Sequence, residues 1–171
     1  MDREKFREEY LYERCWEIGL EPDQKQIGQF LFFYEYLIRK NEVMNLTAIT
    51  EYEDVVIKHF VDSLALIKAV PQIMKKQKQI RMLDLGSGAG FPGIPLKIMF
   101  PEMEILLLDS LQKRVLFMNE VIESCSLSKI KAIHGRAEDM ANTDCRESFD
   151  LCVSRAVANL STLSEYCLPF V

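Results

Sequence analysis

The chain has 171 residues, which suits one domain or one domain with an appendage. Its residues are 49% hydrophobic and 27% charged, a globular composition that excludes wholesale disorder. Twenty-six acidic and 21 basic side chains leave a net charge of −5. This balance excludes a protein coated with basic charge for non-specific nucleic-acid binding, although it leaves room for a local basic patch.

The sequence carries no signal for export or for membrane insertion. Its N-terminal segment is charged and has no apolar signal core, and apolar runs such as Ile105–Leu108 are far too short to span a bilayer. The five cysteines are an odd number without a CxxC pair or a histidine cluster, so thiols in a reducing cytoplasm explain them better than disulfides or zinc. We expect a cytoplasmic monomer with no membrane segment and no metal.

The first seventy residues are predicted to be helical. Apolar side chains recur at helical spacing within residues 1–21, and this helix should end near Gly19. A second helix should begin around Pro22, because a proline at the first helical position costs no hydrogen bond. Residues 41–49 are expected to form a loop. The capping-box pattern Thr50–Glu53 then predicts a third helix that runs to about residue 70.

The hydrophobic period changes after a polar connector at residues 71–79. Short apolar runs typical of buried parallel strands alternate with helical segments, which predicts an α/β fold behind a helical cap. The expected strands are Ile80–Leu85, Ile105–Leu108, Ile130–Ile133 and Phe149–Val153, and the expected helices are Ile94–Phe100, one capped by Ser110, and Ala158–Leu168. Open doubly wound sheets usually have more than about four strands, so we expect this chain to be a fragment of a longer protein.

A glycine-rich turn follows the first expected strand, where residues 84–93 read DLGSGAGFPG. Alternating glycines at the carboxyl end of a strand let the backbone turn sharply and let a ligand approach the main chain. Glycines also weaken a structure unless something uses them. The run therefore predicts a ligand site rather than a tight turn alone.

Two ligands compete for this turn. Residues 88–93 match the GxGxxG pattern of dinucleotide-binding folds, and Asp109 follows Gly90 by 19 residues, as such a fold requires. Asp84 favours S-adenosyl-L-methionine instead, because its carboxylate should sit beside the ligand, where it would repel a pyrophosphate and attract a sulfonium and an ammonium. A charge pair at ~4 Å and an effective dielectric of ~20 is worth roughly 4 kcal/mol before desolvation. An NAD-dependent oxidoreductase remains the alternative.

Asp109 suits either ligand. A carboxylate at the end of the second strand can accept hydrogen bonds from both hydroxyls of a ribose. The structural alternative is a cap for the following helix, a role that Ser110 would fill instead. The spacing from the glycines favours the ribose.

Five blocks, in order along the chain, resemble the GidB/RsmG family of bacterial 16S ribosomal RNA guanine-N7 methyltransferases. They are residues 44–50 (MNLTAIT), 59–64 (HFVDSL), 84–95 (DLGSGAGFPGIP), 108–110 with 113–115 (LDS and KRV), and 154–156 (SRA). Many class I S-adenosylmethionine-dependent methyltransferases share the glycine run, whereas five blocks in sequence are specific. The resemblance implies a helical region at residues 1–74 and a partial Rossmann-like methyltransferase domain, an incomplete doubly wound sheet, at residues 75–171.

The resemblance also implies roles for individual residues. Ala137 and Glu138 would border the adenine, Asp109 would hold the ribose, and Arg155 would contact either the cofactor's carboxylate or an RNA phosphate. The full set of implied cofactor-binding residues is Asp84, Gly86, Gly88, Gly90, Phe91, Asp109, Ala137, Glu138 and Arg155.

The implied chemistry needs no catalytic base, because guanine N7 already carries an in-plane lone pair at neutral pH. His59, on a packed helix, is more typical of a structural residue than of a base. The partner, 16S ribosomal RNA or the small ribosomal subunit, is implied by the resemblance alone. The basic run with Lys75, Lys76 and Lys78 is either an RNA contact or a solvated linker. A class I methyltransferase acting on a small molecule or a protein is the remaining alternative.

Overall fold

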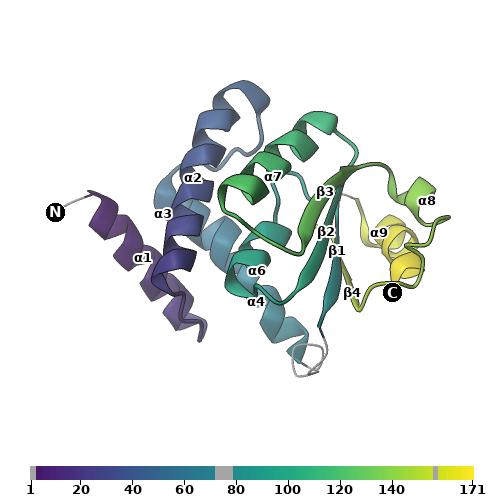
Figure 1. Cartoon of the computed structure of the whole chain (residues 1–171), viewed down its shortest axis with the longest axis horizontal. Helices are drawn as coiled ribbons and strands as arrows, with labels where there is room; N and C mark the ends of the chain where they lie inside the picture. Colours follow the sequence, from purple (N-terminus) through teal and green to yellow (C-terminus); the bar gives the residue numbers. More distant parts are fainter. Residues whose placement is uncertain (1–2, 72–78, 156–157) are drawn as a thin grey trace.

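The computed structural model describes residues 3–71, 79–155 and 158–171, and Figure 1 shows the order of the elements. Two helices come first, α1 (Arg3–Glu17) and α2 (Gln24–Met44). They run in roughly opposite directions and pack against each other. The helical character of the first seventy residues is therefore confirmed for the part that is described.

Helix α2 begins later and ends later than the sequence predicts. The Asp23 carboxylate accepts a hydrogen bond from the Gln26 N–H at 2.8 Å, and Gln26 Oε1 accepts one from the Asp23 N–H at 2.8 Å. This reciprocal cap, rather than Pro22, sets the start of the helix. At the other end the helix runs through Met44, into the expected loop, until Asn45 takes the left-handed conformation with φ 51°.

A third helical rod is built from three consecutive segments: α3 (Tyr52–Val55), η1 (Val56–Val61) and α4 (Asp62–Ala69). The middle segment is π-helical, a wider turn that appears mostly as a local bulge and often at functional sites. The predicted capping box is wrong, because the N-cap is Glu51 and it makes no side-chain capping hydrogen bond. Thr50 lies outside the helix.

The sheet has four parallel strands, β1 (Arg81–Leu85), β2 (Glu104–Asp109), β3 (Ile130–His134) and β4 (Leu151–Val153). Their spatial order is β3-β2-β1-β4. The expected α/β fold and the expected four strands are confirmed. Because all four strands are parallel, their carboxyl ends lie along one edge of the sheet, where open α/β folds place their ligands.

Helices connect and cover the strands. Between β1 and β2 runs α6 (Gly93–Met99), and between β2 and β3 runs α7 (Gln112–Ser124). The short α8 (Ala137–Met140), which the sequence did not predict, follows β3. After β4 come α9 (Leu160–Cys167) and the 3-10 turn η2 (Leu168–Phe170).

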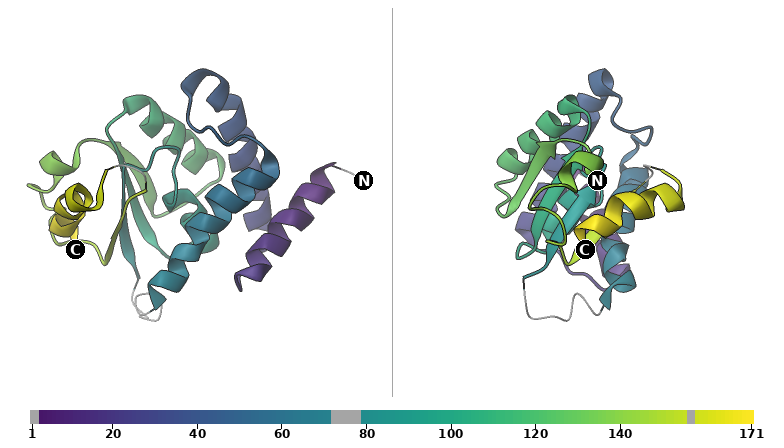
Figure 2. Two further views of the ribbon diagram at one scale, coloured as in Figure 1. Left: turned by 180° about the vertical axis from the view of Figure 1, so that it is seen from behind. Right: turned by 90° about the vertical axis from the view of Figure 1, so that its right-hand side faces the viewer.

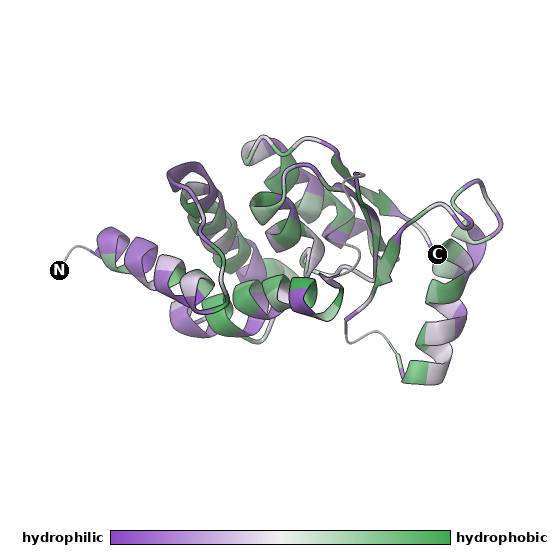
Figure 3. Cartoon of the chain, turned by 90° about the horizontal axis from the view of Figure 1, so that it is seen from below, coloured by the Kyte–Doolittle hydropathy of each residue, from purple (hydrophilic) through white to green (hydrophobic). Residues whose placement is uncertain are grey.

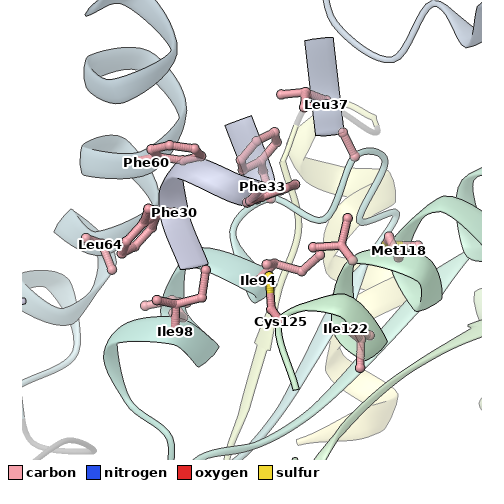
Figure 4. Close-up of a cluster of buried hydrophobic side chains, with 14 of the residues drawn as sticks. Phe30, Phe33, Leu37, Phe60, Leu64, Ile94, Ile98, Met118, Ile122 and Cys125 are labelled. Carbon is pink, nitrogen blue, oxygen red and sulfur yellow. The ribbon is translucent and has the colours of Figure 1, made fainter. Parts of the chain in front are cut away.

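One face of the sheet shares a large apolar core with the N-terminal helices. Figures 1 and 2 show α2, α4, α6 and α7 on this face, and α8 and α9 on the opposite one. At the centre of this core, the centroid of the Phe33 ring lies 5.7 Å from that of Phe60 and 5.2 Å from that of Phe91. Figure 4 shows the side chains that α2, α4, α6 and α7 contribute: Phe30, Leu37, Leu64, Ile94, Ile98, Met118 and Ile122.

A smaller apolar cluster covers the opposite face. Alternate strand residues, such as Leu83 and Leu106, point there and pack with Met140 of α8 and the fully buried Phe170. Helix α9 itself buries none of its residues, although Figure 3 colours several stretches of its ribbon as hydrophobic. In the part of the chain that the structure describes, no helix is both long enough and apolar enough to cross a membrane.

Candidate functional site

The glycine turn between β1 and α6 is fixed to the neighbouring strand. The carbonyl of Leu108 accepts hydrogen bonds from the N–H groups of Gly86, at 2.8 Å, and Ser87, at 3.2 Å. Gly86, Gly88 and Gly90 all have φ in the left-handed region, at 74°, 61° and 89°. The turn therefore lies at the carboxyl edge of the sheet between β1 and β2, and only glycine adopts this path without strain.

Gly93 lets helix α6 approach the sheet. A Cβ at this position would overlap the side chain of Leu107 on β2 and would lie 2.9 Å from Asp84 Oδ2. The absence of that Cβ also lets the Gly93 N–H donate a hydrogen bond to Asp84 Oδ2 at 2.9 Å. The last glycine of the run thus serves close packing of helix on strand, as in the dinucleotide fingerprint.

Asp84 lies beneath the turn with no exposed surface. One carboxylate oxygen, Oδ2, accepts the Gly93 N–H, whereas the other, Oδ1, has no hydrogen-bond partner among the described residues. Burial raises the pKa of Asp84 to about 7, despite the opposing effects of hydrogen bonds and of Arg155. A buried carboxylate with one free oxygen is suited to a cationic group, since an unpaired polar atom in the interior is costly.

Asp109 joins the turn to the helix after β2. Its Oδ2 accepts the Gly88 N–H at 2.8 Å and lies 3.6 Å from Arg114 Nη1, and its Oδ1 accepts the Leu111 N–H at 2.9 Å. The predicted cap by Ser110 is wrong, because the N-cap of α7 is Leu111 and no side chain caps it. A carboxylate has about four acceptor positions, so Asp109 keeps room for further donors.

A first cavity of about 200 Å³ lies beyond Asp109, between the ends of β2 and β3. Its apolar lining comes from Leu85, Leu108 and Ala137. Its lining also includes the polar side chains of Glu138 and Tyr166. Apolar walls with a few polar groups at the edge are typical of a small-molecule site.

A second cavity, of about 380 Å³, lies on the other side of the turn. Its lining is more polar and includes Thr47, His59, Phe91, Arg114 and Arg155. Gly86, Asp109 and Ser110 line both cavities. An elongated ligand lying across the turn at Asp109 would therefore reach into both.

The wall of the second cavity contains a connected polar network. Arg155 Nη2 lies 3.2 Å from His59 Nδ1, and Arg155 Nη1 forms an ion pair with Asp62 at 3.1 Å. On its other side, His59 Nε2 lies 2.8 Å from Thr47 Oγ1. The His59 ring stacks on Phe91 with centroids 4.6 Å apart, and the Arg155 guanidinium lies 5.2 Å from the centroid of the same ring. Burial, with Arg155 nearby, lowers the pKa of His59.

The structure brings most of the predicted site residues to these two cavities. Gly86, Asp109, Ala137 and Glu138 line the first, and Gly86, Gly88, Phe91, Asp109 and Arg155 line the second. Asp84 lies below the turn, and Gly90 packs against Ile94 of α6; neither lines a cavity. Lys75, Lys76 and Lys78 lie outside the described residues. Which of these residues contact a cofactor stays a prediction.

Sequence reasoning missed several residues of the cavity walls. Thr47 and Arg114 lie inside blocks that were noticed only as a resemblance, and Tyr166 comes from a helix to which no role was given. His59 was expected to be structural, and it is largely buried but also lines the second cavity. Its position in the HFVDSL block was the available signal.

S-adenosylmethionine fits this arrangement. Its adenine suits the apolar first cavity, and its ribose hydroxyls suit the open acceptor positions of Asp109. Its positive charges are opposite in sign to the carboxylate of Asp84, which is buried below the turn. A dinucleotide fits less well, because its pyrophosphate would bring negative charge to a turn that already covers a buried carboxylate. Within the described ranges, no group of three or more potential metal ligands occurs.

Comparison with known proteins agrees with the geometry. The model of the GidB family, described as rRNA small subunit methyltransferase G, matches residues 26–171. Two relatives are both named ribosomal RNA small subunit methyltransferase G. The one from Lachnoclostridium phytofermentans is 54% identical, over 90% of this chain and 62% of its own length. The one from Alkaliphilus metalliredigens is 49% identical, over 94% of this chain and 66% of its own length.

A solved structure supports the fold. A protein of Klebsiella pneumoniae, described as a candidate O-methyltransferase, superposes with a TM-score of 0.57 at 15% identity, over 81% of this chain and 60% of that one. The chain spans somewhat less than two thirds of the length of the two sequence relatives named above. With the family model covering most of its residues, the chain belongs to the GidB family, rRNA small subunit methyltransferase G.

Proposed function

We propose that this chain is an S-adenosylmethionine-dependent methyltransferase that modifies N7 of a guanine in 16S ribosomal RNA. The observation that carries the proposal is the pair of cavities that meet at Gly86 and Asp109, beside the glycine turn. Family membership supports methyl transfer to ribosomal RNA. The choice of 16S RNA and of guanine N7 rests on the resemblance of the five sequence blocks.

Each part of the cofactor would meet a different group of residues. Ala137 and Glu138 would border the adenine, and Asp109 would accept hydrogen bonds from the ribose. The turn at Gly86 and Gly88 would lie against the remainder. S-adenosylmethionine supplies an electrophilic methyl group on a sulfonium sulfur. In this proposal residues 75–171 form the cofactor-binding domain and residues 1–74 the helical region before it.

Asp84 would act on the cofactor through its charge rather than from a cavity wall. The pKa of Asp84 is raised, so its ionised form is disfavoured, because burial removes water without supplying a full set of partners. A cationic ligand above the turn would stabilise the carboxylate and lower that pKa. A pyrophosphate would do the opposite, which favours S-adenosylmethionine over NAD.

A reaction that uses no general base is compatible with the contacts of the His59 ring. Its Nδ1 accepts from Arg155 and its Nε2 faces Thr47, so neither ring nitrogen is free to remove a proton from a substrate. Guanine N7 needs no deprotonation before attack. Holding N7 in line with the transferred group can supply about 7–11 kcal/mol of the barrier reduction. The hydrogen bonds between Thr47, His59 and Arg155 in the wall of the second cavity suit that task.

Calorimetry tests the cofactor. We expect the chain to bind S-adenosylhomocysteine and not to bind NADH with comparable affinity. Tight NADH binding would contradict the electrostatic argument from Asp84 and would favour an oxidoreductase.

Mass spectrometry of ribosomal RNA tests the substrate. In cells that lack this protein we expect one 7-methylguanosine to disappear from 16S RNA. If every 7-methylguanosine persists while S-adenosylhomocysteine still binds, the chain is a methyltransferase for another substrate, such as a small molecule or a protein.

A further inference from the structure

The loop after helix α2 holds Thr47 rigidly at the second cavity. Asn41 Oδ1 accepts hydrogen bonds from the N–H groups of Leu46, at 2.6 Å, and Thr47, at 2.9 Å, and Asn41 Nδ2 donates to the Thr47 carbonyl at 2.9 Å. Asn45, in the left-handed conformation, starts the loop. The backbone of Thr47 is therefore fixed on both sides of its Cα, while its side chain lines the cavity.

The proton of His59 has a defined position. A guanidinium has only donors, so the 3.2 Å contact between Arg155 Nη2 and His59 Nδ1 requires that Nδ1 accept. The neutral ring then carries its proton on Nε2, which donates to Thr47 Oγ1 at 2.8 Å. The Asp62 ion pair and the stacking of both groups on Phe91 keep Arg155 and His59 in this relation.

These contacts leave the Thr47 hydroxyl with one remaining function. A hydroxyl has two acceptor lone pairs and one donor hydrogen. His59 Nε2–H occupies one lone pair, and the Ile49 N–H, at 3.0 Å, occupies the other. No acceptor among the described residues takes the hydroxyl hydrogen. Thr47 is thus a fixed hydrogen-bond donor at the cavity wall.

A fixed donor discriminates between the two purines. On the edge that carries N7, guanine presents the acceptors N7 and O6, whereas adenine presents N7 and a donor amino group on C6. A donor directed at position 6 pairs with guanine and meets a second donor in adenine. Pairing at O6 also leaves the N7 lone pair free.

We infer that the part of the second cavity next to Thr47 is a guanine subsite, beside the part at Gly86 and Gly88 that the cofactor would occupy. In this subsite the Thr47 hydroxyl donates to O6, and His59 is the positioning residue that prevents this hydroxyl from accepting. The inference rests on the proposed function, since it names how the same site would recognise its substrate base. Burial, with the charge of Arg155 nearby, lowers the pKa of His59 and so favours the neutral ring. The arrangement requires this form, because an imidazolium would place a donor on Nδ1 opposite the donor of Arg155.

Nucleotide binding tests the inference without measuring methyl transfer. The affinities of GMP, AMP and inosine monophosphate are measured by calorimetry or ligand-observed NMR on the chain saturated with S-adenosylhomocysteine. We expect GMP to bind about tenfold more tightly than AMP. Inosine monophosphate, which keeps O6 but lacks the 2-amino group, should bind like GMP.

Three variants distinguish loss of the Thr47 hydrogen-bond donor from a general loss of folding. In Thr47→Val the preference for GMP should vanish, and in Thr47→Ser, which keeps the hydroxyl, it should return to within about threefold of the original value. In His59→Phe, which keeps a ring beside Phe91 but releases a lone pair of Thr47, AMP should gain affinity relative to GMP. The affinity for S-adenosylhomocysteine and the thermal unfolding temperature report whether each variant still folds.

The outcomes divide cleanly. If the chain binds S-adenosylhomocysteine but binds GMP and AMP equally, or binds neither, the inference is overturned and the proposed function stands on the RNA measurement. A preference for GMP that survives in Thr47→Val also overturns it. If the chain fails to bind S-adenosylhomocysteine, the proposed function fails, and the guanine subsite fails with it.

Discussion

Replacing Asp84 by Asn should stabilise the protein and weaken its cofactor site at the same time. Asp84 is fully buried, and one of its carboxylate oxygens has no partner among the described residues. An amide of the same shape can still accept the Gly93 N–H through its oxygen but carries no charge. The substitution therefore removes the cost of burying the charge while keeping the packing.

The pH dependence follows from the raised pKa. Burial raises the pKa of Asp84 from 3.8 to about 7, so between these values the folded chain binds more protons than the unfolded chain. Stability then falls as the pH rises through this window. At pH 7 the loss amounts to at most about 4 kcal/mol, from roughly 1.4 kcal/mol for each pH unit. The Asn variant has no such group, so its advantage should be absent near pH 4 and fully developed above pH 7.

Urea unfolding at pH 4, 5, 6, 7 and 8 measures this difference. Asp150→Asn is the matched control, because Asp150, just before β4, is an exposed carboxylate that also accepts a backbone N–H, from Arg81 at 2.9 Å. The control should follow the parent protein. An Asp84→Asn variant that is less stable than the parent at pH 7, or whose advantage does not grow with pH, would refute the argument from burial.

Cofactor binding gives the second readout for Asp84→Asn. Since the ionised carboxylate is the group that attracts a cation, the affinity for S-adenosylmethionine should fall in the variant even though the fold is more stable. The loss should be smaller for S-adenosylhomocysteine, which lacks the sulfonium charge. Equal losses for the two ligands would show that Asp84 acts only through the shape of the turn.

Four further substitutions test the packing of two glycines, a buried lysine and the loop after α2. Gly93→Ala should lower the free energy of unfolding by about 1–3 kcal/mol, because its Cβ would overlap Leu107 of β2. Gly28→Ala, in open space on α2, should raise the free energy of unfolding by up to about 1 kcal/mol. Urea titration measures both changes. The pKa of Lys97 is lowered to about 8 by burial, so the unfolded chain binds more protons above pH 8 and stability should rise from pH 8 to 10.5. Unfolding experiments over that range should show no such rise in Lys97→Met, and an identical slope in both proteins would contradict the assignment. In Asn41→Ala, hydrogen exchange of the Leu46 and Thr47 amides should accelerate by about tenfold or more, while unchanged rates would show that the loop does not depend on this side chain.

The sheet could be predicted well from the sequence because each strand is a short, mostly apolar segment that is visible locally. All four expected strands exist, and their bounds differ from the expected ones by no more than two residues. The residues that cap the ends of the helices were harder to predict. Asp109 satisfies the N–H of Leu111, so Ser110 caps nothing, and the choice between two adjacent acceptors depends on how the strand enters the turn. The four-residue helix α8 is too short to show a helical period.

The candidate site could be predicted only in the part that local motifs encode. The glycine turn and Asp109 follow from spacing along two successive strands. The network of Thr47, His59 and Arg155 does not, because its members come from a loop, a helix and a strand end that are 12 and 96 residues apart in sequence. Tertiary packing alone brings them together. The burial of Asp84 with a single partner was likewise invisible, since the sequence shows which residues precede a turn but not which side of it they occupy.

The π-helical segment η1 has a consequence for how this protein tolerates change. Because the π-helical turn takes up one extra residue, the 3.6-residue period of α3 does not continue into α4, and His59 lies within this turn. Deleting one residue there would restore ordinary helical winding with α3 and α4 still aligned, whereas a deletion inside α3 or α4 would rotate everything beyond it by about 100°. The loss of one residue is therefore better tolerated by the fold in Val56–Val61 than in the helices on either side, although it would remove the turn that contains His59.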